Sequence, residues 1–107
     1  PRYGRERFLA VMLAALQGGR LRGRRSAGLV GVGQSLAAWE RTLRAGGIEP
    51  HAIERARPWP RSRRPGPPGE FHTPCVLVFG AVSARDRWRD ALTSSGMTEG
   101  LDFVFVA

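Results

Sequence analysis

Two glycines spaced one residue apart follow an early apolar run and could bring backbone N–H groups close to an anion. Gly31 and Gly33 end this run, and Gln34 and Ser35 follow them. Glycine permits a tight turn and a close backbone approach, whereas Leu36 stands where phosphate-binding turns of this kind usually carry a third glycine. The spacing therefore predicts a strand-to-helix turn. Phosphate binding and tight-turn geometry alone are both sufficient reasons for the two glycines.

A second turn of the same kind follows the next strongly apolar run. Gly80 opens it, and Ser83 with Asp86 three residues later resembles a helix capping box. Arg85 falls in the first helical turn, where a guanidinium can hold a phosphate in bidentate geometry. The alternative for Arg85 is a solvated arginine that pairs with Asp86 or with Glu99.

The remaining candidate for ligand chemistry is an acid. Glu54 lies 23 residues after Gly31, near the end of the next expected strand, where an acid commonly accepts a hydrogen bond from a ribose hydroxyl. His72, Ser35 and Ser83 form no nucleophile-elbow pattern, and we expect both serines to cap helices instead. The two histidines and the single cysteine lack zinc-ligand spacing. We therefore expect no catalytic residues and no metal ligands.

The pattern of apolar residues predicts the elements that position these turns. Continuous apolar runs predict buried strands, and apolar positions at i, i+3 and i+4 predict helices. Pro50 indicates that the second strand lies at a sheet edge, because proline cannot donate to a neighbouring strand. The expected elements are a helix over 5–17, strands at 27–32, 48–54, 75–79 and 102–106, and helices at 35–45 and 83–93.

An internal repeat with an offset of 49 residues supports the same elements. Trp39 and Leu43 correspond to Trp88 and Leu92, and each helix is followed by a glycine. Each half reads as strand, glycine turn, helix, glycine stop and strand. Two such units predict a small three-layer α/β domain of Rossmann-like type, with four parallel strands in the order 2-1-3-4 and a leading N-terminal helix.

The predicted strand order places a ligand crevice. In an open parallel sheet, ligands bind beyond the carboxyl ends of the strands at the point where the strand order reverses. This point lies between the first and third strands, so the two glycine turns face a common crevice. The candidate ligand-binding residues are Gly31, Gly33, Gln34, Ser35, Glu54, Gly80, Ser83 and Arg85.

The net charge of +8 comes from two segments rather than from the expected sheet and helices. Residues 1–25 hold seven arginines and one glutamate, and residues 55–70 hold five arginines and one glutamate. Residues 26–54 and 71–107 each carry a net charge of −1. We therefore divide the chain into a basic N-terminal helix and connector at 1–25 and a domain at 26–107 with an Arg/Pro-rich loop at 55–70.

Three roles fit the N-terminal helix. Its apolar face suits a helix that covers one side of the sheet, but an arginine-rich and nearly acid-free segment also suits a targeting sequence. Docking on a membrane surface or a partner chain is the third role. No apolar run approaches the roughly 20 residues that span a bilayer. We expect a cytoplasmic protein, with an N-terminal targeting segment as the alternative.

The segment from Arg57 to Glu70 contains five prolines and two glycines and predicts an extended loop of polyproline character. Trp59 stands among arginines, where an exposed aromatic could stack on a base or insert into a partner; a loop tip without a partner is the alternative. The candidate partner-binding residues are Arg57, Trp59, Arg61, Arg63 and Arg64. We expect the partner to be another protein chain or larger assembly, with nucleic acid or an anionic membrane surface as alternatives.

Several short motifs resemble a known type of domain. Leu29-Val30-Gly31-Val32-Gly33, followed by Trp39 and Leu43 and later by Val78-Phe79-Gly80 with Arg85, resembles the small Rossmann-like domain fused to some bacterial family-two glycosyltransferases. The segment 99–107 is similar to the end of that domain and of the nucleotide-sugar-binding N-terminal domain of bacterial sugar acyltransferases. In those families an acidic Asp-x-Asp-Pro-like segment ends the second strand, whereas Glu54-Arg55-Ala56-Arg57-Pro58 stands here.

The resemblance implies a nucleotide or sugar-nucleotide site and no transferase activity, because residues 1–107 contain no counterpart of the transferase catalytic domain. We therefore expect a non-catalytic accessory module that binds such a ligand at the two glycine turns. The alternative is a degenerate Rossmann-like scaffold that acts as a structural or assembly subunit through its basic arm and Arg/Pro loop.

Overall fold

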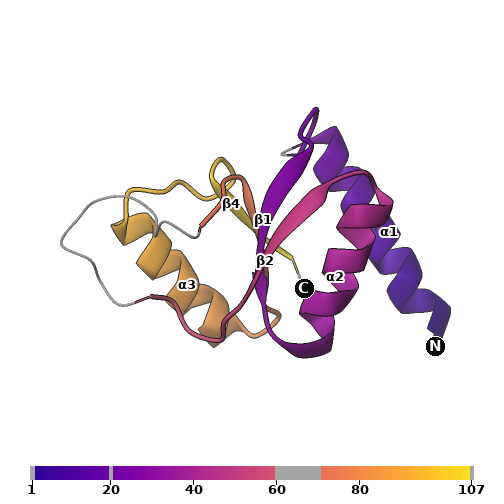
Figure 1. Ribbon diagram of the computed structural model, residues 1–107. Coiled ribbons are helices and arrows are strands. Elements are labelled where there is room, and N and C mark those ends of the chain that lie inside the picture. The colour runs from indigo at the N-terminus through magenta and orange to yellow at the C-terminus, as the bar shows by residue number, and fades with distance from the viewer. Residues whose placement is uncertain (1, 20, 60–70, 107) are drawn as a thin grey trace.

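The computed structural model describes residues 2–19, 21–59 and 71–106 as one α/β domain (Figure 1). Its elements are α1 (Arg2–Gly18), β1 (Ser26–Gly31), α2 (Gly33–Ala45), β2 (Glu49–Glu54), β3 (Cys75–Val78), α3 (Val82–Ser94) and β4 (Phe103–Val106). The four strands pair in parallel in the order β2-β1-β3-β4. The predicted fold class, strand order and leading helix are confirmed, and β2 lies at an edge as Pro50 indicated.

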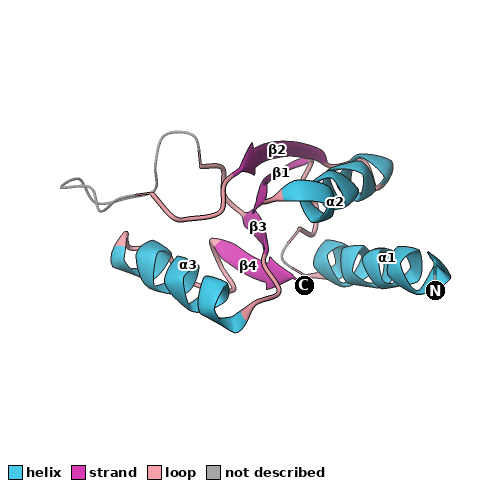
Figure 2. Cartoon of the chain, turned by 90° about the horizontal axis from the view of Figure 1, so that it is seen from below, coloured by secondary structure: helices cyan, strands magenta, loops and turns pink. Residues whose placement is uncertain are grey.

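Helices lie on both faces of the sheet (Figure 2). α1 and α2 cover one face and α3 covers the other, and side chains that alternate along the strands feed both layers. The core against α1 and α2 includes Leu29, Val76, Val78 and Val106 of the sheet with Trp39 and Leu43 of α2. The core against α3 includes Val30, Leu77 and Phe103 with Trp88 and Leu92 of α3. β1 and β3 are therefore buried on both sides, as their continuous apolar runs predicted.

The two halves match in three dimensions as they do in sequence. α2 and α3 each span 13 residues and begin 49 residues apart. Trp39 and Trp88 are both fully buried. The helices are followed by Gly47 and Gly96 at φ +82° and +89°, a left-handed conformation that favours glycine. The residue after each glycine donates a backbone hydrogen bond to the carbonyl of the buried leucine, at 2.9 and 3.0 Å.

The helices begin earlier than the serines indicated. Val32 and Ala81 are the N-cap residues, and neither makes a side-chain capping hydrogen bond. Ser35 and Ser83 lie inside the first helical turns, so their predicted capping roles are wrong, and so is the capping box with Asp86. Val32 alone separates β1 from α2, and Phe79, Gly80 and Ala81 separate β3 from α3.

Helix α1 covers the sheet beside α2. Leu16 is buried, and Leu9, Met12 and Leu13 pack against the same core cluster as Trp39. This packing confirms the interpretation of the N-terminal helix as a cover for one side of the sheet. None of the helices in the described ranges is long and apolar enough to cross a membrane.

The described ends of the connection from β2 to β3 lie on the same face of the sheet as α3. A right-handed crossover in this direction lies on that side of the sheet. Trp59 and Phe71, near the two ends of the connection, belong to the same core cluster as Trp88. The Trp59 ring meets Phe71 and Trp88 edge-on, with centroids 6.1 and 5.7 Å apart. These two aromatic side chains cover a part of the sheet that a crossover helix covers in an ordinary Rossmann fold.

The end of this connection crosses directly over β1 at Gly28. The Gly28 N–H donates a hydrogen bond to the Pro74 carbonyl at 3.0 Å. A Cβ atom on Gly28 would overlap the carbonyl oxygen of His72 and lie 3.2 Å from the Cys75 sulfur. Only glycine therefore allows the linker to approach β1 this closely.

We expect Gly28→Ala to lower the free energy of unfolding by about 2 kcal/mol, because the added methyl group must displace backbone rather than a side chain. Urea unfolding followed by circular dichroism measures the change. Gly18→Ala is the control, because a Cβ atom there meets nothing within 4 Å. Equal midpoints for Gly28→Ala and the wild type would contradict the close approach.

Candidate functional site

The carboxyl ends of β1 and β3 lie side by side in the sheet, and α2 and α3 begin within a few residues of them. The strand order reverses between these two strands, as predicted. The structure therefore brings the glycine turn after β1 and the glycine turn after β3 to the same edge of the sheet. We take this edge as the candidate site.

Gly31 and Gly33 of the first turn are glycines for different structural reasons. Gly31 is buried, and a Cβ atom there would lie 3.2 Å from Cβ of Val78 and 3.5 Å from Cβ of Leu36. Gly33 is exposed and adopts φ +62°, where a side chain would be strained. Gly31 thus permits close packing of strand on helix, and Gly33 permits the turn itself.

Glu54 reaches this turn from the end of β2. The Gly33 N–H donates a hydrogen bond to Glu54 Oε1 at 3.4 Å, and the carboxylate is exposed. This places a negative charge at the N-terminus of α2, where the helix dipole favours it. α2 has no acid in its own first turn. A phosphate at this helix end would compete with Glu54, whereas a ligand hydroxyl could donate to the carboxylate.

The Arg85 guanidinium is held near the end of β3. Its Nε donates to the Phe79 carbonyl at 2.6 Å, and its Cζ lies 5.9 Å from the centroid of the Phe105 ring. Phe105 belongs to β4, so the guanidinium extends toward β4, on the side of β3 away from β1. The Nη groups make no hydrogen bond within the described residues. Arg85 is half-buried, which limits its motion.

The ion pairs expected for Arg85 belong to Arg89, one helical turn later. Its guanidinium contacts Glu99 at 2.7 Å and Asp86 at 3.0 Å. The hydrogen bond to Glu99 is the main reason that the pKa of Arg89 is raised. Arg89 therefore satisfies both acids and leaves Arg85 to the backbone carbonyl.

The other candidate residues at this edge are exposed to solvent. Gln34, Ser35 and Ser83 are exposed, as is Gly80, around which a Cβ atom would meet nothing within 4 Å. Two apolar residues that were not among the candidate ligand-binding residues also lie here. Val32 is 40% exposed and Val82 is 73% exposed, and they flank the two helix starts. Val32 could be noticed in the sequence, because it occupies the N-cap position of α2, where a polar residue is usual.

Trp59 does not project from an open loop. Its side chain is half-buried in the α3 core, which corrects the expectation of an exposed aromatic. Arg55 lies over the indole, with Cζ 4.7 Å from the ring centroid, and its Nε donates to the Arg57 carbonyl at 2.8 Å. Arg57 is exposed. The other predicted partner-binding residues, Arg61, Arg63 and Arg64, lie outside the described residues.

Cys75 and the histidines form no metal site among the described residues, where no group of three potential ligand side chains is present. His51 and His72 stack on each other with ring centroids 3.8 Å apart. Cys75 is buried at the start of β3, and burial strongly raises the pKa of its thiol. A protonated, enclosed thiol is chemically inert.

We compared the chain with models of protein families, with curated proteins and with solved structures, and none of the three comparisons returned a match.

We expect Trp59→Ala to lower the free energy of unfolding by about 2 kcal/mol, because it removes half-buried aromatic packing from Trp88 and Phe71. Urea unfolding followed by tryptophan fluorescence measures the loss. Arg57→Ala is the matched control in the same segment, since its side chain is exposed. If Trp59→Ala is as stable as Arg57→Ala, Trp59 is not a core residue.

We expect the Cys75 thiol to be unreactive toward Ellman's reagent in the folded protein and to react at the rate of a free cysteine in denaturant, because burial keeps it protonated and enclosed. Absorbance at neutral pH follows the reaction. Rapid modification of the native protein would show that the start of β3 opens to solvent.

Proposed function

We propose that this domain is a non-catalytic Rossmann-like module that binds a nucleotide or sugar nucleotide beyond the carboxyl ends of β1 and β3. One observation supports it above the others. The acid that the sequence analysis assigned to a ribose hydroxyl, Glu54, reaches the N–H of Gly33 in the first glycine turn. An acceptor for a sugar hydroxyl and a turn at a helix start therefore lie together at the point where the strand order reverses.

The arrangement suggests where each part of the ligand would lie. A ribose hydroxyl would donate to Glu54, beside the start of α2. A phosphate would lie at the start of α3, whose first turn contains no acid and whose N-cap residue, Ala81, makes no side-chain hydrogen bond. Val32 and Val82 offer exposed apolar surface to the rings of the ligand. Arg85 would need to turn its free Nη groups toward the phosphate.

The proposal includes binding and no reaction. Catalysis at this edge would need a nucleophile held by a base. Ser35 and Ser83 are exposed, and neither makes a side-chain hydrogen bond to another described residue. The resemblance to the domains of bacterial glycosyltransferases and sugar acyltransferases also suggests a binding module.

We expect nucleotides and sugar nucleotides at millimolar concentration to raise the melting temperature of the full chain, since a ligand of the native state stabilises it by mass action. Glu54→Ala should weaken binding of ribose-containing ligands roughly tenfold, the effect of one lost charge-assisted hydrogen bond. Glu49→Ala is the matched control, an exposed glutamate at the opposite end of the same strand. Isothermal titration calorimetry measures the affinities.

Two results would reject this site. The first is the absence of any thermal shift across the ligand panel. The second is tighter binding of pyrophosphate and of nucleotides alike by Glu54→Ala, because the carboxylate would then be a substitute anion for the start of α2 and not an acceptor for ribose.

The second candidate function is an assembly scaffold that acts through the basic N-terminal segment 1–25 and the Arg/Pro-rich segment 55–70. Arg22, Arg24 and Arg25 are exposed after α1, which favours contact with an acidic partner. Deleting residues 57–69 does not test this function, because the deletion also removes Trp59 from the core. Charge reversal at Arg57 with Trp59 retained separates the two effects.

A further inference from the structure

Helix α1 carries no charged side chain between Phe8 and Gly19, although only one of its faces is buried. The opposite face, which we call the outer face of α1, consists of Ala10, Val11, Ala14 and Ala15, all of them exposed. Val11 is 59% exposed. A surface helix normally presents charged residues on this side, and a helix that is apolar all round is normally covered.

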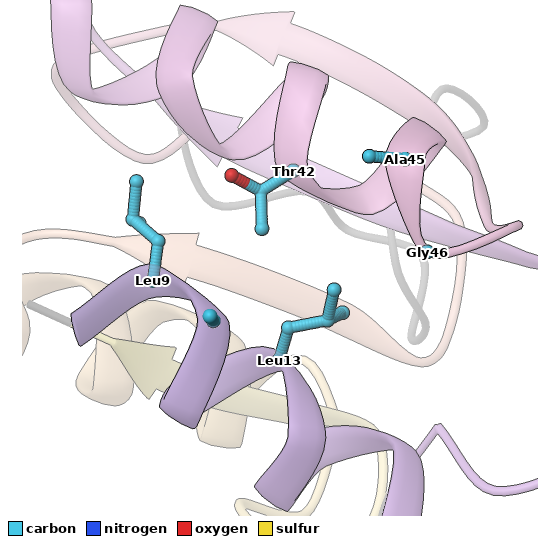
Figure 3. Close-up of a pocket in the computed structure, with 6 residues that line it drawn as sticks. Leu9, Leu13, Thr42, Ala45 and Gly46 are labelled. Carbon is cyan, nitrogen blue, oxygen red and sulfur yellow. The ribbon is translucent and has the colours of Figure 1, made fainter. Parts of the chain in front are cut away.

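An apolar groove adjoins the outer face (Figure 3). It has a volume of about 280 Å³ and is lined by Leu9, Ala10 and Leu13 of α1 and by Thr42, Ala45 and Gly46 of α2. Figure 3 shows Leu9 and Leu13 extending from α1 toward α2 across the gap. Ala10 belongs to both the groove and the outer face, so the two form one continuous apolar surface.

Polar groups at the groove are already paired within the chain. The Thr42 hydroxyl donates to the Ala38 carbonyl at 2.8 Å, and the Gly46 carbonyl accepts from Gln17 Nε2 at 2.8 Å. The groove therefore offers apolar contact and few free hydrogen-bonding groups. Covering such a surface with apolar side chains is favourable in free energy, because they displace water without leaving a polar group unpaired.

Two arginines lie at the margin of this surface. Arg7 precedes Val11 by four residues and Arg41 precedes Ala45 by four residues, so each shares a helix face with a residue of the surface. Both arginines are exposed, and neither makes an ion pair within the described residues. The sequence from 7 to 25 contains no acid. A partner that covers the apolar surface would bind more tightly if it also brought negative charge to the arginines at the margin.

We propose that the α1–α2 groove and the outer face of α1 bind an apolar helix of a partner protein whose flanks carry aspartate and glutamate. The small residues Ala10, Ala45 and Gly46 let a third helix approach the first two closely. A second copy of this chain would bring its own arginines to the same margin. A flat lipid surface would leave the groove unfilled and would find alanine and valine where interfacial helices carry large anchors.

The probe is a set of labelled helical peptides of about 18 residues, long enough to span the groove. Each carries leucine and alanine at i, i+3, i+4 and i+7 with glutamate on both flanks, and a matched peptide replaces each glutamate with lysine. Fluorescence anisotropy with the full chain, without nucleotide, should show saturable binding of the glutamate peptides and none of the lysine peptide. The binding should weaken as salt rises.

We expect Val11→Glu and Arg41→Glu each to weaken peptide binding roughly tenfold or more, because the first places a charge within the apolar surface and the second reverses a charge at its margin. Leu101→Glu is the matched control, because Leu101 is also 59% exposed but lies outside the groove, and it should leave binding unchanged. Circular dichroism and melting temperature check that each variant is folded.

Four results would overturn the proposal. One is no saturable binding by any glutamate peptide, and another is equal binding by the lysine peptide or by Val11→Glu. Binding to phosphatidylserine vesicles that Val11→Glu abolishes would assign the surface to a membrane. A dimer in sedimentation that Val11→Glu dissociates would assign it to a second copy. These experiments do not test the proposed nucleotide site, because none of the variants changes a residue of the crevice.

Discussion

A parallel sheet that is apolar on both sides must be covered on both sides, and this requirement organises the whole molecule. Three helices provide most of the cover, with α1 and α2 on one face and α3 on the other. The aromatic ends of the β2–β3 connection complete the second face. Trp88 lies at the centre of this arrangement, stacked on Phe79 and edge-on to Trp59.

The fold was predictable because its signals are redundant. Apolar runs, glycine turns and the 49-residue repeat indicate the same strands and helices, and the matched positions of Trp39 and Trp88 confirm the repeat. The helix starts were predicted less well. A serine cap contributes about 1 kcal/mol, whereas the strand ends are determined by the whole buried core. Ser35 and Ser83 therefore fall inside the helices, despite their local preference for the cap.

The candidate site was also predicted in part. The positions of the strand ends were predicted well, because parallel strands end at a common edge of the sheet. The acid at the end of β2 therefore reaches the turn after β1. The contacts of the long side chains were not predicted. Glu99 approaches from a separate loop and pairs with Arg89, which leaves Arg85 to the carbonyl of Phe79, just after β3. Trp59 was misjudged for a related reason. Its neighbours in sequence are prolines and arginines, but its neighbours in space are Phe71 and Trp88.

The contact between Trp59 and Phe71 has a consequence for how this chain can vary. The two residues precede and follow residues 60–70 in the sequence, and their rings, with centroids 6.1 Å apart, both pack in the α3 core. The entropy of closing a flexible loop rises by only about 0.6 kcal/mol for each doubling of its length. Sequence between the two aromatics can therefore lengthen or diverge with little cost to the sheet. The domain has a natural insertion point, where new sequence can be acquired while the fold that carries it is retained.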